Sequence, residues 1–248
     1  MNNEIKQAVI LAGGRGERLR PFTDHLPKPM IPVNGRPFIE YELDVLKKNG
    51  IEEIVFLVGY LHQKFIEHFG DGRRFGLDIK YHVGAVEDDT GTRVRNAKSL
   101  FAPEFLLLYG DVYWPFLELK KMSEFFHSTG KMALMVAYDN KDGRGEQGFK
   151  CNVMIDESNK VLRYFKNTEG SPIDPECKWT ETGFLILSRK VVDWMPKKEN
   201  FSLNQITLPD LVKRNELVAW KTDQVQETIT SPKHLSDFAD KMKSLKAS

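Results

Sequence analysis

Cysteine, excess charge and long apolar runs are all scarce in this chain of 248 residues. Its two cysteines, Cys151 and Cys177, are too few for a metal cluster of their own and do not suggest a disulfide scaffold. The formal net charge of +1 gives no reason to expect nucleic acid or an anionic membrane as a partner. No apolar run approaches about 18 residues, the length of a membrane span, and the opening MNNEIKQ lacks a signal-peptide pattern. We therefore expect a protein of the reducing cytoplasm.

Histidine-based chemistry has no support in the sequence pattern either. The six histidines have no metal-ligand spacing, and no Ser-His-Asp or Cys-His arrangement is visible. With 41% hydrophobic and 29% charged residues, the composition is that of an ordinary globular protein, long enough for one large α/β domain. We expect residues 1–248 to form that single domain, with two functional halves that divide at about residue 115.

Strand and helix candidates alternate through the first half, which indicates βαβ units and a mostly parallel central sheet flanked by helices. The strand candidates are Ala8–Leu11, Glu53–Val58, Ile79–His82 and Phe105–Tyr109, and the helix candidates are Phe38–Lys48, Gln63–Phe69 and Thr92–Leu100. Shorter strand candidates follow at Ala133–Tyr138, Asn152–Ile155, Val161–Tyr164 and Thr182–Leu187. They predict a smaller mixed β part that forms one side of a crevice. Residues 202–219 read as a helix followed by a strand, and Ser231–Leu245 as a final helix capped by Ser231.

The stretch from Ala8 to Pro32 carries the strongest signal. A short apolar strand leads into a loop with three glycines, Gly13, Gly14 and Gly16. Because these residues have no side chains, their backbone N–H groups can approach a polyphosphate closely and wrap around it. Taken alone, such a loop is equally typical of a tight strand-to-helix turn. It is neither a Walker A loop nor the dinucleotide fingerprint, because no GK[ST] follows and Leu19 replaces the third glycine.

Two cations stand beside this loop. Arg18 lies two residues beyond the last glycine, and Lys28 sits between Pro27 and Pro29, so a fork-shaped donor and a point charge can converge on the same phosphates. The spacing GGxGxRxxP followed by PKP resembles that of the sugar-1-phosphate nucleotidyltransferases, whose signature is LAGGxGxRLxPxTxxxPKPMxP. The resemblance extends over about residues 6–238.

This resemblance implies a Rossmann-like sheet and an enzyme that joins a nucleoside triphosphate to a sugar 1-phosphate. The products would be an NDP-sugar and pyrophosphate. Arg18 and the amides of Gly13–Gly16 would stabilise the departing pyrophosphate, and Lys28 the α-phosphoryl group. The half at about 1–115 would bind the nucleotide, and the half at about 116–248 the acceptor.

The resemblance also locates the nucleoside. The base and ribose would lie against the backbone at Leu11, Ala12 and Gly13 and against the loop Asp88–Thr92, which makes Gly91 a binding candidate. Arg93 stands where the family usually has a small residue. For Arg93, contact with a phosphate and a position facing solvent both stay open.

Carboxylates supply the candidate metal site. The strand Phe105–Tyr109 ends at Gly110-Asp111, and open α/β sheets bind ligands at the carboxyl ends of their strands. Asp111 can be a turn residue or a ligand of Mg²⁺, which prefers oxygen. The resemblance favours Mg²⁺, because the family places its metal-binding Asp in this pattern. It also implies a second ligand from a (D/E)xGTP motif. Here the chain reads Glu227-Thr-Ile-Thr-Ser-Pro232, one position out of place, so Glu227 is the candidate.

The acceptor site is implied less directly. Lys166 occupies the place of a second family lysine, normally found as EKP, that neutralises the phosphate of the sugar 1-phosphate. Asn152-Val153 and Tyr164 are similar to a short bacterial subgroup that includes the muramic acid and heptose 1-phosphate nucleotidyltransferases. Asn152 is therefore a further acceptor-binding candidate.

Glu181 and Gly183 resemble the family's acidic-x-Gly element, in which the carboxylate accepts hydrogen bonds from sugar hydroxyls. A Glu that closes a turn is the alternative interpretation.

The implied acceptor is thus a muramic acid, heptose or mannose-like 1-phosphate for bacterial surface glycans. Two alternatives stay open: a cytidylyltransferase acting on a non-sugar phosphate such as phosphocholine, and a non-catalytic paralogue that has kept the nucleotide cradle. The base and self-association as a homo-oligomer stay open as well.

Overall fold

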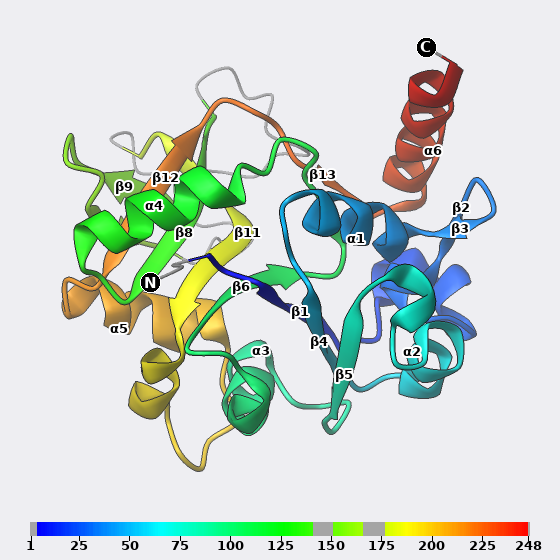
Figure 1. Cartoon of the computed structure of the whole chain (residues 1–248), viewed down its shortest axis with the longest axis horizontal. Coiled ribbons are helices and arrows are strands. Elements are labelled where there is room, and N and C mark those ends of the chain that lie inside the picture. Colours follow the sequence, from blue (N-terminus) through cyan, green and yellow to red (C-terminus); the bar gives the residue numbers. More distant parts are fainter. Residues whose placement is uncertain (1–3, 141–150, 166–176, 248) are drawn as a thin grey trace.

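The structure is a computed structural model that describes residues 4–140, 151–165 and 177–247. In this part of the chain nine strands form one sheet flanked by helices (Figure 1). Its parallel core runs in the order β5-β4-β1-β6. The bounds are β1 (Gln7–Ala12), β4 (Glu53–Val58), β5 (Asp78–Val83) and β6 (Glu104–Tyr109). Every residue of β1 is buried, as expected for a central strand covered on both faces. The predicted α/β fold with a mostly parallel sheet is confirmed.

The second half of the chain continues the same sheet. β11 (Trp179–Ser188) lies antiparallel to β6 and to β8 (Ala133–Asp139), and β12 (Leu217–Thr222) lies parallel to β8. The short strands β9 (Val153–Ile155) and β10 (Val161–Tyr164) pair with each other, and β9 bridges to Trp179 at the start of β11. The predicted mixed β part is therefore present, as an extension of the central sheet.

Most helices agree with the sequence pattern. α1 (Phe38–Lys48) has the predicted bounds, and α2 (His62–Phe69) begins one residue early. α3 (Thr90–Asn96) starts two residues before its predicted position because the Asp89 side chain caps it, accepting a hydrogen bond from the Thr90 N–H at 2.6 Å. The sequence analysis assigned no element to α4 (Leu119–Thr129).

Residues 202–219 contain two helical segments. A π-helix, Leu203–Thr207, runs into α5 (Leu208–Lys213), and β12 follows. Pro209 lies in the first turn of α5, where a missing N–H costs no helical hydrogen bond. α6 (Pro232–Ala247) begins as predicted, with the Ser231 hydroxyl accepting from the His234 N–H at 3.3 Å.

Two short ribbons complete the described chain. β2 (Pro32–Val33) pairs with β3 (Arg36–Pro37), and β7 (Val112–Tyr113) pairs with β13 (Glu227–Thr228). The second ribbon follows directly after β6 and Asp111.

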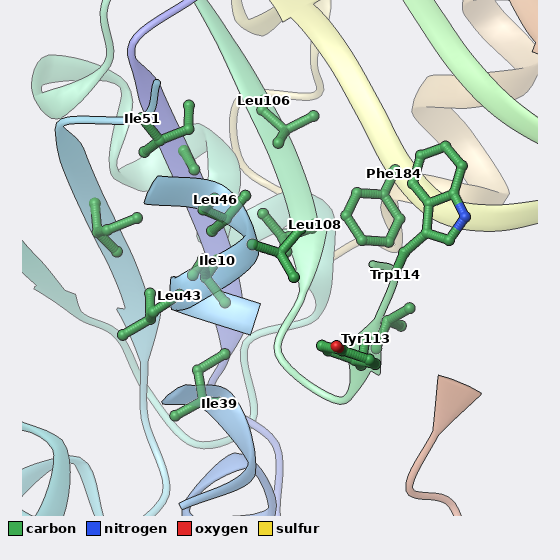
Figure 2. Packing of buried hydrophobic residues seen from close by; sticks show 14 of the residues in the cluster. Ile10, Ile39, Leu43, Leu46, Ile51, Leu106, Leu108, Tyr113, Trp114 and Phe184 are labelled. Atoms are coloured by element: carbon green, nitrogen blue, oxygen red, sulfur yellow. The ribbon is translucent and has the colours of Figure 1, made fainter. Parts of the chain in front are cut away.

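Apolar clusters cover both faces of the sheet. Alternate residues of β1 supply the two clusters: Ile10 lies in one, with helix α1, and Leu11 in the other, with β11 and α5. Figure 2 shows the first cluster, in which Trp114 packs on Phe184 with ring centroids 5.3 Å apart. The packed layers fix the strands, so the loops at their carboxyl ends can carry the site.

Candidate active site

Two cavities lie side by side at the carboxyl ends of β1 and β6. The first, which we name the cradle cavity, has a volume of about 280 Å³ and is lined by the glycine loop together with Lys28 and Asp111. The second, the polar cavity, has a volume of about 410 Å³ and is lined mainly by hydroxyl, amide and carboxyl groups. Residues that line both are Asp89, Thr90, Tyr109 and Asp111. The two cavities therefore meet at Asp111.

The three glycines of the cradle cavity differ in what a side chain would meet at each position. Gly16 has a φ of +64°, and a Cβ there would lie 2.9 Å from the Lys28 Cβ. At Gly13 a Cβ would lie 2.2 Å from the Arg93 guanidinium. At Gly14 a Cβ would meet nothing within 4 Å in the described chain, so the loop is open toward the cavity there. Leu11 and Ala12, two of the candidates for nucleotide binding, line the same cavity.

Lys28 and Asp111 form an ion pair between the Nζ and Oδ2 atoms. Lys28 lies in a 3-10 turn, Lys28–Met30, flanked by prolines that fix the backbone. The side chains are 13% and 28% exposed, so both charges are held near the cavity walls with limited access to water. Two of the three predicted catalytic residues, Lys28 and Asp111, are thus brought together.

Arg18 lies at the mouth of the polar cavity and not in the cradle cavity. Its side chain is exposed, and its charge is close enough to act on His234. Burial lowers the pKa of His234, Asp237 opposes this effect, and Lys233, Lys28 and Arg18 lower the pKa further. Arg18 and Lys28 therefore both lie close enough to His234 for their charges to act on it.

Asp111 fits a Mg²⁺ site that is completed by substrate. Its Oδ2 binds Lys28, whereas Oδ1 accepts no hydrogen bond within the described residues. No group of three metal-ligating side chains occurs among these residues. Mg²⁺ is commonly held by one or two carboxylates together with substrate phosphates, which matches a single carboxylate beside a phosphate cradle.

Glu227 is not brought to Asp111. In the β7–β13 ribbon, Val112 and Thr228 line the polar cavity, so their neighbours Tyr113 and Glu227 face the other side. There the Glu227 carboxylate forms an ion pair with Lys241 of α6. The placement gives no support to Glu227 as a second metal ligand. The sequence pattern misled because a shift of one residue in a strand reverses the direction of the side chain.

Gly91 also has a different role from the one expected. Its N–H donates to the Phe201 carbonyl at 3.0 Å, and a Cβ would lie 2.2 Å from the Phe201 ring. Gly91 lines neither cavity, whereas its neighbours Asp89 and Thr90 line both. The small residue is therefore needed for packing of α3 against the segment at Phe201.

Arg93 does not face solvent: it is 3% exposed, and its guanidinium donates to backbone carbonyls beside the cradle loop. Arg93 also lines the cradle cavity. The solvent-facing alternative is therefore wrong, and contact with a phosphate stays a prediction.

Glu181 and Gly183 form part of the polar cavity as predicted. Gly183 has a φ of +86° at an irregularity of β11, and its N–H donates to Glu181 Oε1 at 2.7 Å. The Asn152 side-chain oxygen accepts from the Glu181 N–H at 2.8 Å. Removal from water raises the pKa of Glu181 to about 7, although hydrogen bonds from Gly183, Tyr164 and Asn204 oppose the rise.

Asn204 and Tyr109 belong to the site but were missed in the sequence. The Asn204 Nδ2 donates to Tyr164 Oη at 2.7 Å and to Glu181 Oε2 at 3.3 Å, and its Oδ1 accepts from Tyr109 Oη. Asn204 lies on the π-helix, a local irregularity often found at functional sites. No periodicity or motif marks it, so no sequence signal available here would have found it. Lys166 lies outside the described residues.

Residues 7–195 match the family model described as nucleotidyl transferase. The chain belongs to this family. It is 29% identical, over 83% of its length, to a UTP–glucose-1-phosphate uridylyltransferase of Synechocystis, and 35% identical, over 47%, to a D-glycero-alpha-D-manno-heptose 1-phosphate guanylyltransferase of Campylobacter jejuni. The matches cover 55% and 52% of those proteins. The chain thus spans about half the length of these relatives.

A solved structure has the same fold. HddC from Yersinia pseudotuberculosis, complexed with GMP-PN, superposes with a TM-score of 0.74 at 23% identity, over 96% of this chain and all of that one. The two relatives named above differ in the nucleotide that they use, since one is a uridylyltransferase and the other a guanylyltransferase. In the described part of the nucleotidyl transferase chain, no helix is both long and apolar enough to cross a membrane.

Proposed function

We propose that this chain joins a nucleoside triphosphate to a sugar 1-phosphate and releases pyrophosphate. The observation that carries the proposal is the Lys28–Asp111 pair at the point where the glycine cradle and the polar cavity meet. A nucleotide in the cradle cavity and an acceptor in the polar cavity would bring their phosphates to this pair. The names of the relatives support the same reaction class.

The reaction needs position and charge more than proton transfer. An oxygen of the acceptor phosphate attacks the α-phosphorus, a new P–O bond forms, and the bond to the β-phosphate oxygen breaks. Pyrophosphate leaves with the electron pair, and the NDP-sugar remains. Lys28 holds positive charge at the α-phosphoryl group, and the glycine amides bind the leaving phosphates. Arg18 lines the polar cavity, so in this structure its charge lies on the acceptor side of the junction between the cavities.

Asp111 is the residue that would hold Mg²⁺. When bound, the ion would neutralise charge on the triphosphate. Lys28 keeps the Asp111 carboxylate in place through Oδ2. Because the structure does not bring Glu227 to this site, we assign the remaining ligand positions to phosphate oxygens and water.

The acceptor is a polyhydroxylated phosphate, in our proposal a heptose, muramic acid or mannose-like 1-phosphate. The polar cavity offers donors and acceptors from Asn152, Glu181 and Asn204, with further hydroxyls of Thr and Ser around them. Such groups recognise hydroxyls, which an apolar wall cannot bind. The heptose 1-phosphate guanylyltransferase among the relatives supports this class. A role in surface glycan synthesis is part of our proposal.

The test is pyrophosphate release with Mg²⁺ across the four common nucleoside triphosphates, each combined with heptose, mannose, glucose and muramic acid 1-phosphates and with phosphocholine. We expect release with a sugar 1-phosphate, and release that is slower by at least about 10²-fold with Lys28→Ala. Release with phosphocholine alone would move the chain to the cytidylyltransferase alternative. Nucleotide binding without release in any combination would favour the non-catalytic paralogue. Cytoplasmic location and self-association stay predictions.

A further inference from the structure

We propose that Arg93 is a positioning residue that locks the cradle loop in its binding conformation before the nucleotide arrives. Its guanidinium donates to four backbone carbonyls. Nη1 reaches Val58 O at 3.1 Å, and Nη2 reaches Gly13, Ala85 and Val86 at 3.3, 2.9 and 3.0 Å. These carbonyls follow or end β1, β4 and β5, so one side chain connects the carboxyl ends of three of the four strands in the parallel core.

The surroundings of Arg93 are shaped to hold a planar guanidinium. A Cβ on Gly13, Gly59 or Gly84 would lie 2.2, 2.7 or 3.4 Å from the guanidinium atoms. Three glycines from three different loops therefore leave the space that it fills. A Cβ on Gly59 would also lie 2.9 Å from the Gly13 carbonyl, and one on Gly84 would lie 2.8 Å from Asp88 Oδ2, so the space beside Arg93 is closely bounded.

The charge of Arg93 lies near three acidic residues. No carboxylate lies within ion-pair distance of it among the described residues, and burial lowers the pKa of its guanidinium while Asp88, Asp89 and Glu87 raise it. Asp88 and Asp89 line the cradle cavity. The cation therefore offsets two carboxylates that would otherwise repel a polyphosphate.

A glycine-rich loop needs such a lock, because glycine loses more backbone freedom than other residues when it is ordered. Because Arg93 already holds the Gly13 carbonyl, part of this loss of backbone entropy has occurred before the nucleotide binds. Lysine cannot replace the arginine, since a point charge has no fork that spans carbonyls from separate strands. The predicted effect of Arg93 on the nucleotide KM rests on the proposed function, whereas its effect on the conformation of the cradle loop does not.

The decisive comparison is between Arg93→Lys and Arg95→Lys. Arg95 lies on the same helix and also donates to carbonyls, those of Pro196 and Glu199, at 2.7 and 2.9 Å. Neither carbonyl belongs to a residue that lines the two cavities. In the nucleotide-free protein, we expect amide hydrogen exchange of residues 11–16 to become at least about tenfold faster in Arg93→Lys and to be unchanged in Arg95→Lys. Unchanged exchange in a folded Arg93→Lys protein would overturn the proposal.

Gly59→Ala provides a second route to the same result. Its Cβ would lie 2.7 Å from Arg93 Nη1 and 2.9 Å from the Gly13 carbonyl, so it would disturb the contact between these two residues directly. If Arg93→Lys does not fold, faster exchange at residues 11–16 in Gly59→Ala supports the lock, and wild-type exchange there overturns it. Exchange needs neither nucleotide nor turnover, so its result is separate from that of the pyrophosphate assay.

Steady-state kinetics test the effect of Arg93 on nucleotide binding. For the nucleoside triphosphate that gives the fastest pyrophosphate release, Arg93→Lys should raise KM by about tenfold and change kcat by less than about threefold. A lower kcat at unchanged nucleotide KM would assign Arg93 to another step and overturn its role in the cradle. Absence of release by the wild-type protein would refute the proposed function and leave the exchange result as the measure of the lock.

Discussion

The cradle cavity and the polar cavity are built in opposite ways. The cradle cavity is built around one short stretch, in which Leu11, Ala12, Gly13, Gly14 and Gly16 line it, and its other lining residues come from segments that include Lys28 and Asp111. The polar cavity is made of side chains from separate segments, with Asn152, Glu181 and Asn204 as its polar centre. A backbone cradle suits a triphosphate, which every nucleotide shares. A side-chain cavity suits an acceptor that must be distinguished from others.

This difference indicates which cavity can change its substrate specificity by single substitutions. A substitution in the polar cavity alters one hydrogen-bonding group, whereas the cradle depends on loop geometry and on the buried support of Arg93. The cavities share Asp111 and Tyr109, so the charged pair that links them should serve both substrates. The following experiments test whether the two regions can be separated.

Lys28→Ala should have the largest effect, because Lys28 lies where both cavities meet. We expect kcat to fall by at least about 10²-fold, the scale seen when a preorganised charge at the transition state is lost. Pyrophosphate release at saturating substrates is the measurement, with Lys64→Ala as the control, since Lys64 is paired with Glu67 on exposed α2. Near-normal turnover in a folded Lys28→Ala protein would show that the reaction does not need the Lys28–Asp111 ion pair.

Glu181→Gln should affect the acceptor alone. The KM for the acceptor should rise about tenfold, as a charge-assisted hydrogen bond is lost, while the KM for the nucleotide stays within about twofold. A comparable rise in both values would show that the two cavities do not act independently.

The pH dependence sharpens this test. The pKa of Glu181 is raised to about 7, so the carboxylate is mostly protonated at pH 6 and mostly ionised at pH 8. Only the ionised form accepts hydrogen bonds with both oxygens. The acceptor KM of the wild type should therefore fall as the pH rises from 6 to 8, and Glu181→Gln should remove this contribution. Equal pH profiles for the two proteins would mean that Glu181 does not contact the acceptor.

The same contrast explains how far the sequence could be read. The bounds of α1 and β4 followed from periodicity and end signals, and the Gly13–Gly16 loop with Lys28 from one short motif. Tyr109 and Asn204 come together only through the sheet order and the π-helix, which no local pattern encodes. Arg93 could not be placed because its four acceptors are carbonyls, and backbone groups leave no trace in the sequence.

Asn204→Ala should have a smaller effect, again confined to the acceptor. It removes a 3.3 Å hydrogen bond to Glu181 and leaves the hydroxyls of Tyr109 and Tyr164 without this partner. We expect the acceptor KM to rise about threefold and the free energy of unfolding to fall by about 1–3 kcal/mol. Because a donor to the carboxylate is lost, the pH at which acceptor KM changes should move upward. Kinetics at several pH values and urea denaturation provide both measurements.

Glu227→Gln should have the smallest effect, although the sequence motif suggested a metal ligand there. Its carboxylate is 22% exposed and forms an ion pair with Lys241, which is 41% exposed, on the side of the ribbon away from the polar cavity. Losing such a partly exposed pair costs at most about 1 kcal/mol of stability. The midpoint of a Mg²⁺ titration of pyrophosphate release should stay at its wild-type value, whereas Asp111→Asn should abolish the Mg²⁺ response. A higher midpoint for Glu227→Gln would mean that β13 rotates when substrate binds, so that Glu227 faces the cavity and acts as a metal ligand. An unchanged midpoint would leave Asp111 as the carboxylate that joins the two cavities, with the phosphates of both substrates completing its site.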